Sequence, residues 1–320
     1  MHIVIVNNTR IPVLKYGGTE RVIWWLGQEL TRAGHKVTYL VAPGSSCPFA
    51  DVLPLQPGKS LDEQIPENAD LVHIHFPIRE PLKKPYLVTI HGNGKPGEVY
   101  DPQTVFVSKD HARRHNSAHF VYNGLGLDDY GTVDWNQKRS HWTFLAKGSR
   151  LEKNKIGAIQ LTKSVREPLM IIGSRGFTFN TLVKYKGFLG GQEKLRVLNT
   201  SKGLLFPIRW HEPFGLSILE SLYFGGPVLG TPYGSLPELV PSDMGVLSNN
   251  PEELTEAMNH IEDFDRKACH QYVIDRFHAN QMAKDYLVYY ERVMNGEQLH
   301  KTPPSSTYTR KHQLLPFGTK

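Results

Sequence analysis

The sequence predicts an α/β protein made of two consecutive doubly wound units, each a parallel sheet with helices on both faces. Two observations support this prediction. Short, continuous apolar runs alternate with amphipathic helical stretches, and the alternation starts afresh after a polar stretch at residues 130–141. The chain is also long enough for two domains, since it has 320 residues, of which 39% are hydrophobic and 21% charged, as is typical of globular proteins.

The first unit begins with the apolar run MHIVIV, which is typical of a strand buried on both faces. The segment ERVIWWLGQELTRAG follows as a helix whose apolar face is formed by Val22, Ile23, Leu26 and Leu30. Because this helix separates MHIVIV from the next strand, HKVTYLVAP, the two strands are expected to pair in parallel. Further strands are predicted in DLVHIHF, PYLVTIHG, TVFVSK and HFVYNG.

The second unit begins after the polar stretch YGTVDWNQKRSH. Its strands are predicted in HWTFLAKG, EPLMIIG, GLLFPI and PVLGTP, and its helices include KIGAIQLTKSV and FGLSILESLYFG. We therefore predict a first domain at residues 1–135, a second domain at 140–276, a helix at 277–296, and a flexible tail at 300–320, which is polar and contains proline.

The overall charge narrows the classes of partner. A net charge of +6 can attract anions such as nucleotide diphosphates, acidic lipid surfaces or nucleic acid. The cationic residues are scattered and no RNA- or DNA-binding motif is present, so nucleic acid is not an expected partner. The charge permits a peripheral contact with an acidic membrane surface without indicating one.

The apolar runs and the cysteines indicate the compartment. No run approaches the roughly 18 to 20 apolar residues that span a bilayer. Strand-like residues begin at once and the polar NNTR follows, so no signal peptide is predicted and the expected location is cytoplasmic. Cys47 and Cys269 lie far apart without CxxC spacing, which argues against a disulfide framework and a cysteine-based zinc site.

The loop GGTE is the first candidate ligand site. Gly17 and Gly18 come after a strand and open a helix. Without side chains they let backbone N–H groups approach a ligand, and the start of a helix favours an anion. We interpret the loop as a phosphate site, with an ordinary flexible turn as the alternative. It is neither GxGxxG nor a P-loop, so no dinucleotide site is predicted.

A pair of basic residues in KGSRLEKNKIG is the second candidate. Arg150 and Lys155 flank the turn between a strand and a helix of the second unit. Side chains that follow the carboxyl end of a strand are placed to meet a ligand. A guanidinium and an ammonium suit a diphosphate and can stabilise charge on a leaving group. The alternative is a solvated basic loop.

The segment HEPFGLSILE is the third and most specific candidate. Its carboxylates, Glu212 and Glu220, lie eight positions apart (220 − 212). Carboxylates accept hydrogen bonds from hydroxyls, so Glu212 can reach a hexose and Glu220 a ribose. The turn and the helix start, where backbone N–H groups can hold a phosphate, comprise Pro213, Phe214, Gly215, Leu216 and Ser217.

The order of these motifs resembles a known family. GGTERV, NGLGLDDY, GSRLEKNK, HEPFGLSILESL and GSLPELV follow one another as in family 4 of the retaining glycosyltransferases. The resemblance covers about residues 1–295. It implies the GT-B fold, in which two Rossmann-like domains enclose an interdomain cleft. The segment FHANQMAKDYLVYYERV is similar to the C-terminal helix of that family, which crosses back to the first domain.

The resemblance assigns the phosphate contacts. Arg150 and Lys155 match the diphosphate-binding Arg and Lys of the family, whose separation is also five (155 − 150). Gly17 and Gly18 match glycines of the first domain near the donor diphosphate.

The resemblance also assigns the sugar and nucleoside contacts. Glu212 and Glu220 match the two ends of an E-x7-E motif, of which the first contacts the donor sugar and the second the ribose. His91 in TIHG matches a histidine of the first domain near the transferred sugar. Gly173 and Ser174 in IIGSRG fall where nucleoside contacts are found.

The activity that the resemblance implies is transfer of a sugar from a nucleotide-diphosphate sugar, with retention of anomeric configuration and without a metal or another cofactor. No protein nucleophile is evident, so front-face attack is favoured, with the leaving phosphate taking the acceptor proton. Ile208 stands where many members have serine, and residues 173–190 are shorter than usual, so the donor base is not inferred. The acceptor, a sugar, a lipid-linked glycan or a small metabolite, is expected near Asn8, Arg10 and the residues after His91.

Other functions are compatible with the same sequence. His73 and His75 share one face of a strand and with His91 can form a three-histidine zinc site, or they line the cleft as hydrogen-bonding groups. An epimerase or hydrolase acting on a nucleotide sugar can use the same fold, as can a non-catalytic sugar-nucleotide-binding module. Phosphorolysis dependent on pyridoxal phosphate needs a Schiff-base lysine, and none is identifiable.

Overall fold

The computed structural model describes residues 1–13, 15, 17–309 and 313–318. These residues form two compact units. Unit 1 comprises residues 1–13, 17–126 and 278–309. Unit 2 comprises residues 15, 127–277 and 313–318. Each unit has its own sheet and its own hydrophobic core.

Unit 1 is built on a six-stranded sheet in which all the pairings are parallel. Its strands are β1 (His2–Val6), β2 (Lys36–Val41), β3 (Asp51–Pro54), β4 (Leu71–Ile74), β5 (Tyr86–Ile90) and β6 (Thr104–Phe106). The spatial order is β3-β2-β1-β4-β5-β6, so the direction of winding reverses between β1 and β4. In doubly wound sheets this reversal opens a crevice at the carboxyl ends of the strands, where ligands bind.

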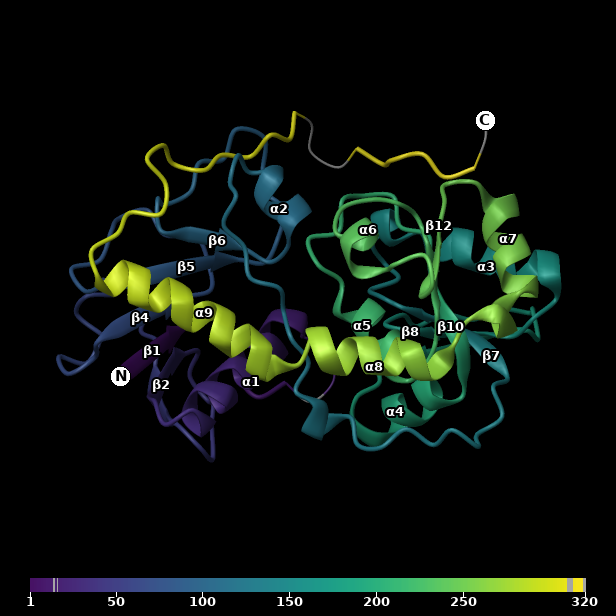
Figure 1. The fold of residues 1–320 in the computed structure, drawn as a ribbon, viewed down its shortest axis with the longest axis horizontal. Coiled ribbons are helices and arrows are strands. Elements are labelled where there is room, and N and C mark those ends of the chain that lie inside the picture. The colour runs from purple at the N-terminus through teal and green to yellow at the C-terminus, as the bar shows by residue number, and fades with distance from the viewer. Residues whose placement is uncertain (14, 16, 310–312, 319–320) are drawn as a thin grey trace. The chain divides into compact units, whose positions relative to one another are not determined.

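The helices of unit 1 are α1 (Gly18–Arg32), α2 (Lys109–Arg113) and α9 (Ala279–Met294). The predicted apolar face of α1 is confirmed, since its four residues are at most 1% exposed. Helix α9 packs against α1 and β5, and Figure 1 shows it lying along this unit. Its Tyr290 hydroxyl lies 2.8 Å from His73 Nδ1, which fixes the helix on the sheet. The prediction of a C-terminal helix on the first domain is therefore confirmed.

Unit 2 repeats the same topology. Its strands are β7 (His141–Leu145), β8 (Leu169–Ile172), β9 (Val183–Gly187), β10 (Ser201–Phe206), β11 (Val228–Gly230) and β12 (Gly245–Leu247). The order β12-β11-β10-β7-β8-β9 reverses its direction of winding between β7 and β10. Two parallel doubly wound sheets confirm the predicted fold class.

The helices of unit 2 cover this second sheet (Figure 1). They are α3 (Lys155–Val165), α4 (Gly191–Asn199), α5 (Leu216–Tyr223), α6 (Leu236–Leu239), α7 (Pro251–Asn259) and α8 (Arg266–Arg276), with short 3-10 turns at Leu127–Asp129, Leu151–Lys153 and Ile261–Asp263. The core between β7, α3 and α7 is centred on Trp142, Phe144 and Leu254, none of which is measurably exposed. Among the described residues, no helix combines the length and the apolar character needed to span a bilayer.

Three strands and one loop depart from the sequence prediction. The run HFVYNG was expected to be a strand but forms a single bridge, between Phe106 and Phe120. Strands β3, β9 and β12 were not expected, because none of them is a continuous buried apolar run and two of them carry exposed polar residues. Edge strands with one exposed side lack the continuous apolar run that marks a buried strand.

The chain end, which the sequence predicts to be a flexible tail from residue 300, makes backbone hydrogen bonds where the structure describes it. In unit 1, Tyr100 donates to Pro304 at 2.8 Å and Ser305 donates to His115 at 2.9 Å. In unit 2, Leu315 donates to Arg209 at 2.8 Å. Loop groups that no strand satisfies thus find their partners in this segment.

Candidate functional site

Two loops of unit 2 lie at the point where its sheet reverses direction. One follows β7, carries Arg150 and leads into α3, whose first residue is Lys155. The other follows β10 and carries Glu212. The loops are joined by hydrogen bonds. Arg209 N donates to Glu152 O at 2.7 Å, and Asn154 Nδ2 donates to Pro207 O at 2.8 Å. The predicted basic and acidic residues are therefore on adjacent loops, as the doubly wound topology requires.

A lysine that was not predicted from the sequence contacts Glu212. The ammonium of Lys153 lies 2.5 Å from Glu212 Oε2, and Trp210 Nε1 donates to the same oxygen at 2.8 Å. The ammonium also lies 4.5 Å from the centroid of the Trp210 ring, a cation–π distance. Glu212 is 8% exposed, so its carboxylate is held in one orientation by two donors.

A left-handed turn explains why Lys153 was missed. Asn154, with φ of 52°, lies between Lys153 and Lys155 and accepts a hydrogen bond from Gly157 N at the start of α3. The chain changes direction at this residue, so the two lysines have different partners. Lys155 was predicted from its position beside the turn and from the resemblance, in which it stands five positions after Arg150. In the sequence, the asparagine in EKNK marks the turn.

Lys155 joins the predicted nucleoside residues. Its ammonium lies 3.3 Å from Ser174 Oγ. Gly173 N donates to Gly187 O at 2.7 Å, and Gly187 N donates to Ser174 O at 3.1 Å. Gly173 has φ of +94°, and a Cβ there would lie 2.3 Å from Ala146 O, so only glycine fits. The structure therefore brings three predicted residues together at the ends of β7 and β8.

Arg150 lies at the surface of the same loop. Its side chain is 52% exposed, and its guanidinium is 3.6 Å from Glu152 Oε1. A pair this exposed contributes little to stability. The guanidinium is therefore available to a ligand without a large cost in folding.

Glu220 is more deeply placed than the prediction implies. It is 1% exposed in α5, forms an ion pair with Lys194, and accepts a hydrogen bond of 2.6 Å from the Tyr130 hydroxyl. Both partners bind the same oxygen, Oε1. Its contact with a ribose stays a prediction.

The turn before α5 depends on two glycines. Gly215 has φ of +95° and precedes the helix without a side-chain cap, so Leu216 N and Ser217 N open the helix as predicted. Gly234 has φ of +68° and pairs with Glu212, and a Cβ there would lie 2.2 Å from Glu212 N. Ser235 N donates to Glu212 O at 2.9 Å. Pro213 and Phe214 are buried and anchor this turn.

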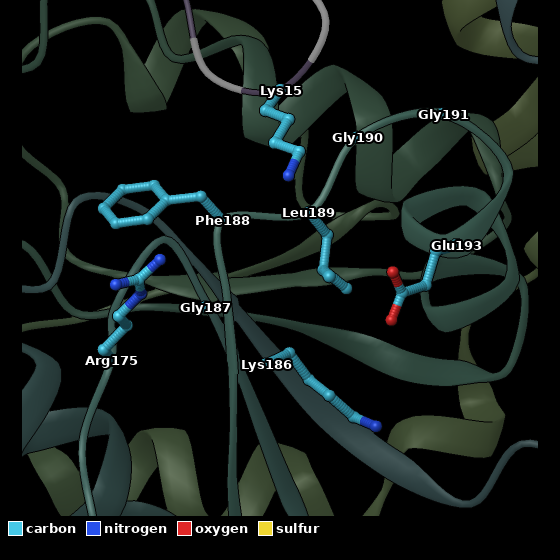
Figure 2. A pocket seen from close by; sticks show the side chains of 9 residues that line it. All are labelled: Lys15, Arg175, Lys186, Gly187, Phe188, Leu189, Gly190, Gly191 and Glu193. Atoms are coloured by element: carbon cyan, nitrogen blue, oxygen red, sulfur yellow. The ribbon is translucent and has the colours of Figure 1, made fainter.

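A cavity of about 500 Å³ in unit 2 adjoins Gly173 and Ser174. Three of its side chains are cationic and one is a carboxylate. The residues are Lys15, Arg175, Lys186, Gly187, Phe188, Leu189, Gly190, Gly191 and Glu193. Figure 2 shows Arg175 and Phe188 close together on one side and Glu193 on the other. None of these residues was predicted from the sequence, although Arg175 directly follows Ser174.

His91 lies in unit 1, where it belongs to a cluster of uncharged imidazoles. His91 Nε2 is 2.9 Å from His75 Nδ1. Burial lowers the pKa of His91 to about 4. Burial, followed by the charge of a neighbouring imidazole, holds the pKa values of His73 and His75 well below their usual range. These rings are therefore neutral at pH 7.

The alternative of a three-histidine zinc site has no support in this geometry. Both ring nitrogens of His73 lie 2.8 Å from hydroxyls, those of Tyr290 and Thr89. Within residues 1–13, 15, 17–309 and 313–318, no group of three or more His, Cys, Asp or Glu side chains is arranged to hold a metal ion.

Gly17 and Gly18 lie at the start of α1, as predicted. The first turn of this helix already has a carboxylate. A Cβ at Gly17 would lie 2.7 Å from Glu20 Oε2, so the side chain of Glu20 folds back over the helix start. A carboxylate here complements the helix dipole. Phosphate binding at these glycines stays a prediction.

Known proteins are similar to this chain in fold, and a family model matches part of unit 2. Residues 179–274 match the family model of glycosyl transferases group 1. A crystal structure of AviGT4, a glycosyltransferase involved in avilamycin A biosynthesis, is 21% identical, with a TM-score of 0.78 over 92% of this chain and 98% of that one. Sucrose-phosphate synthase from Thermosynechococcus elongatus is 14% identical, with a TM-score of 0.72 over 92% and 100%.

A curated relative is also similar over a shorter stretch. An uncharacterized 41.2 kDa protein in the cps region of Klebsiella pneumoniae is 28% identical over 116 residues, which is 34% of this chain and 32% of that protein. The match thus spans about a third of its length.

The chain has the GT-B fold. The resemblance to group 1 glycosyltransferases is confirmed for the part of unit 2 from residue 179 to 274, which contains Glu212 and Glu220. The narrower assignment to family 4 stays a prediction.

Proposed function

We propose that this protein transfers a sugar from a nucleotide-diphosphate sugar to a hydroxyl acceptor, with retention of configuration and without a metal. The observation that carries the proposal is the pair of loops after β7 and β10. They join Glu212 to Lys153 at 2.5 Å, place Lys155 beside Ser174, and leave Arg150 half-exposed. This puts a fixed carboxylate and cations on one edge of one sheet.

The donor contacts follow from the chemistry of each group. Glu212 accepts hydrogen bonds from hydroxyls of the donor hexose, because Lys153 and Trp210 leave its second oxygen, Oε1, for a ligand to approach. Arg150 and Lys155 bind the diphosphate. The nucleoside enters the cavity of unit 2, where the ring of Phe188 and the guanidinium of Arg175 offer a stacking surface.

HepE from Anabaena, whose crystal structure with UDP and glucose is 13% identical to this chain with a TM-score of 0.65, supports a nucleotide-sugar donor on this fold. It covers 91% of this chain and 99% of that one.

The transfer step requires no nucleophile from the protein. The acceptor oxygen forms a bond to the anomeric carbon while the bond from that carbon to the diphosphate oxygen breaks. The electron pair of the broken bond stays on the diphosphate, and the acceptor proton moves to a phosphate oxygen. Arg150 and Lys155 stabilise the negative charge that develops there. Attack from the face that the leaving group vacates retains the configuration.

The first experiment identifies the donor. The purified protein is heated with UDP-, GDP-, ADP- and dTDP-sugars, and the melting temperature is recorded. A donor at 100 times its Kd raises the unfolding free energy by about 2.7 kcal/mol. If none of the nucleotide sugars shifts the melting temperature, the proposal is wrong.

The second experiment tests the cations. In the Arg150→Ala, Lys155→Ala double variant, turnover should fall by about 10²–10³-fold. Lys184→Ala, a change on the exposed strand β9, is the control. Near-normal turnover in the double variant rejects the assignment.

The products separate the remaining classes of function. Proton NMR of fresh product reports the anomeric configuration, and turnover after EDTA treatment reports any need for metal. Free sugar without an acceptor product indicates a hydrolase, an isomeric nucleotide sugar indicates an epimerase, and binding without turnover indicates a binding module.

A further inference from the structure

A cavity of about 420 Å³ lies at the reversal point of the sheet in unit 1. It is bounded by the ends of β1, β4 and β5 and by the start of α1. Its residues are Asn7, Asn8, Thr9, Thr19, Glu20, His75, Phe76, Pro77, Ile90, His91, Gly92, Asn93, Lys95, Glu98 and Tyr100. The carboxyl ends of β1 and β4 are where the topology favours a ligand. Its volume falls in the range of small-molecule sites.

The charges in this cavity do not suit an anion. In the part of the chain that the structure describes, Lys95 is the one lysine or arginine that lines it, and it stands against the carboxylates Glu20 and Glu98. Glu20 also lies over the start of α1, the place where a helix would attract a phosphate. A phosphate or carboxylate ligand would therefore meet like charge. The cavity of unit 2 shows the opposite composition, with three cations and one carboxylate.

The remaining lining groups suit hydroxyls. Amides and threonine hydroxyls both donate and accept hydrogen bonds, and a carboxylate accepts strongly from a hydroxyl. Phe76 and Pro77 supply an apolar wall on the same side as β4. A polyhydroxylated ring with one C–H face matches this combination better than a lipid chain, which would leave the polar groups unsatisfied.

His75 has a ring nitrogen without a partner among the residues that the structure describes. The residue is 5% exposed, and its Nδ1 is 2.9 Å from His91 Nε2, whereas its Nε2 is buried with no hydrogen bond to any of them. Buried polar atoms are nearly always paired, so an orphan beside a cavity marks a missing partner. Two neutral imidazoles share a single N–H between them. One outer nitrogen of the pair therefore donates and the other accepts, and a hydroxyl satisfies either.

The loop that forms one wall is held in place before any ligand arrives. His111 Nε2 lies 3.1 Å from Gly92 O, and Gly94 N donates to His115 Nε2 at 3.1 Å. His115 Nδ1 in turn lies 2.7 Å from His111 O. The bond from Gly94 N requires a neutral His115, because Nε2 must accept it, and together the bonds fix the loop at two points. A preformed wall reduces the ordering cost of binding.

We propose that this cavity binds the acceptor, and that the acceptor presents a neutral, hydroxyl-rich sugar ring held by Glu20 and His75. The inference rests on the proposed transferase function for the role of the sugar, but not for its binding. It commits to a sugar without phosphate or carboxylate groups.

The test uses saturation-transfer NMR on the full chain. The probes are the methyl glycosides of glucose, galactose and mannose, together with their 6-phosphates and the corresponding methyl uronates. At least one neutral glycoside should bind, and its charged analogues should bind at least about tenfold more weakly. Tighter binding of a phosphate or a uronate, or binding of no neutral glycoside, overturns the proposal.

Two variants test the named residues. Glu20→Gln should weaken binding of the neutral glycoside by about tenfold or more, because it replaces a charged acceptor. His75→Gln tests the orphan nitrogen in the same way. Glu67→Gln, a change of the same type at an exposed position of unit 1, should leave binding unchanged. Unchanged affinity in both cavity variants overturns the assignment.

Nucleotide-sugar stabilisation, measured on the same samples, separates the two proposals. If nucleotide sugars stabilise the protein but neutral glycosides do not bind, the acceptor inference fails alone. If glycosides bind and no nucleotide sugar does, the transferase proposal fails and the cavity remains a sugar site.

Discussion

The reversal points of the two sheets have the same topology and opposite chemistry. In unit 1 the point between β1 and β4 carries neutral imidazoles and the carboxylates Glu20 and Glu98. In unit 2 the point between β7 and β10 carries Lys153, Lys155 and a carboxylate, Glu212, that is already paired. The difference teaches that the fold sets where a ligand binds, whereas the loop side chains decide which charge that ligand has.

Removing the buried carboxylate of unit 2 should have the largest effect. Glu220→Ala leaves the ammonium of Lys194 buried without its partner, and the loss in unfolding free energy should be about 3–5 kcal/mol. Urea denaturation measures it. The Glu220→Ala, Lys194→Met double variant should recover much of the loss. Equal stability of the single and double variants would contradict the ion-pair explanation.

The next effect separates the two cavities by kinetics. Lys153→Met removes one of the two donors that orient Glu212, so turnover should fall by about 10²-fold or more. Glu20→Gln in unit 1 should instead raise the acceptor KM. Steady-state kinetics with donor and acceptor varied separately give both results. If Lys153→Met raised the acceptor KM and left turnover unchanged, the two cavities would not have the separate roles proposed for them.

Acid should weaken unit 1 through its imidazoles. The pKa of His91 is lowered from 6.5 to about 4, so the unfolded chain binds more protons than the folded one between these values. Stability is therefore full above pH 6.5 and falls as the pH drops toward 4, by on the order of 2 kcal/mol at pH 5 for this group. The pKa of His141 in unit 2 is also lowered to about 4 by burial.

Hydrogen exchange at pH 7 and pH 5 checks this effect region by region. Peptides that cover β4 and β5 should lose more protection than those that cover β7, because His73, His75 and His91 lie together whereas the groups that shift the pKa of His141 include no second imidazole. Equal losses in the two units would show that the imidazole cluster is not the cause.

The smallest effect concerns the turn between the two lysines of unit 2. Asn154→Ala removes the cap on Gly157 N and the bond to Pro207 O, and should cost about 1 kcal/mol. Thermal denaturation measures it. Arg166→Ala, at the left-handed residue that ends α3 in the same unit, is the control for backbone strain. A cost no greater than that of the control would mean that the cap contributes nothing.

Much of the fold could be predicted from the sequence, because buried strands and amphipathic helices have distinct apolar periods. The runs MHIVIV and GLLFPI became central strands β1 and β10. The exposed edge strands β3 and β9 carry no such run and were not predicted. The spacing of apolar residues indicates which elements are buried, so half-exposed elements are not predicted from it.

The candidate site was predicted in part for a similar reason. Glu212 and Lys155 could be placed on neighbouring loops, because motif order and topology determine which strand ends meet. Lys153 could not, since its direction depends on the left-handed residue Asn154. Arg175 and the orphan nitrogen of His75 depend on packing between segments distant in the chain, which spacing does not encode.

The backbone around Glu212 restricts position 234 to glycine. Any Cβ at that position would collide with the main chain of Glu212, and the left-handed backbone adds a second penalty. Gly58 is equally left-handed, with φ of +88°, but a Cβ there would meet no neighbouring atom of the described chain within 4 Å. In a library of randomised codons, asparagine should therefore survive selection at position 58, while every active clone retains glycine at position 234.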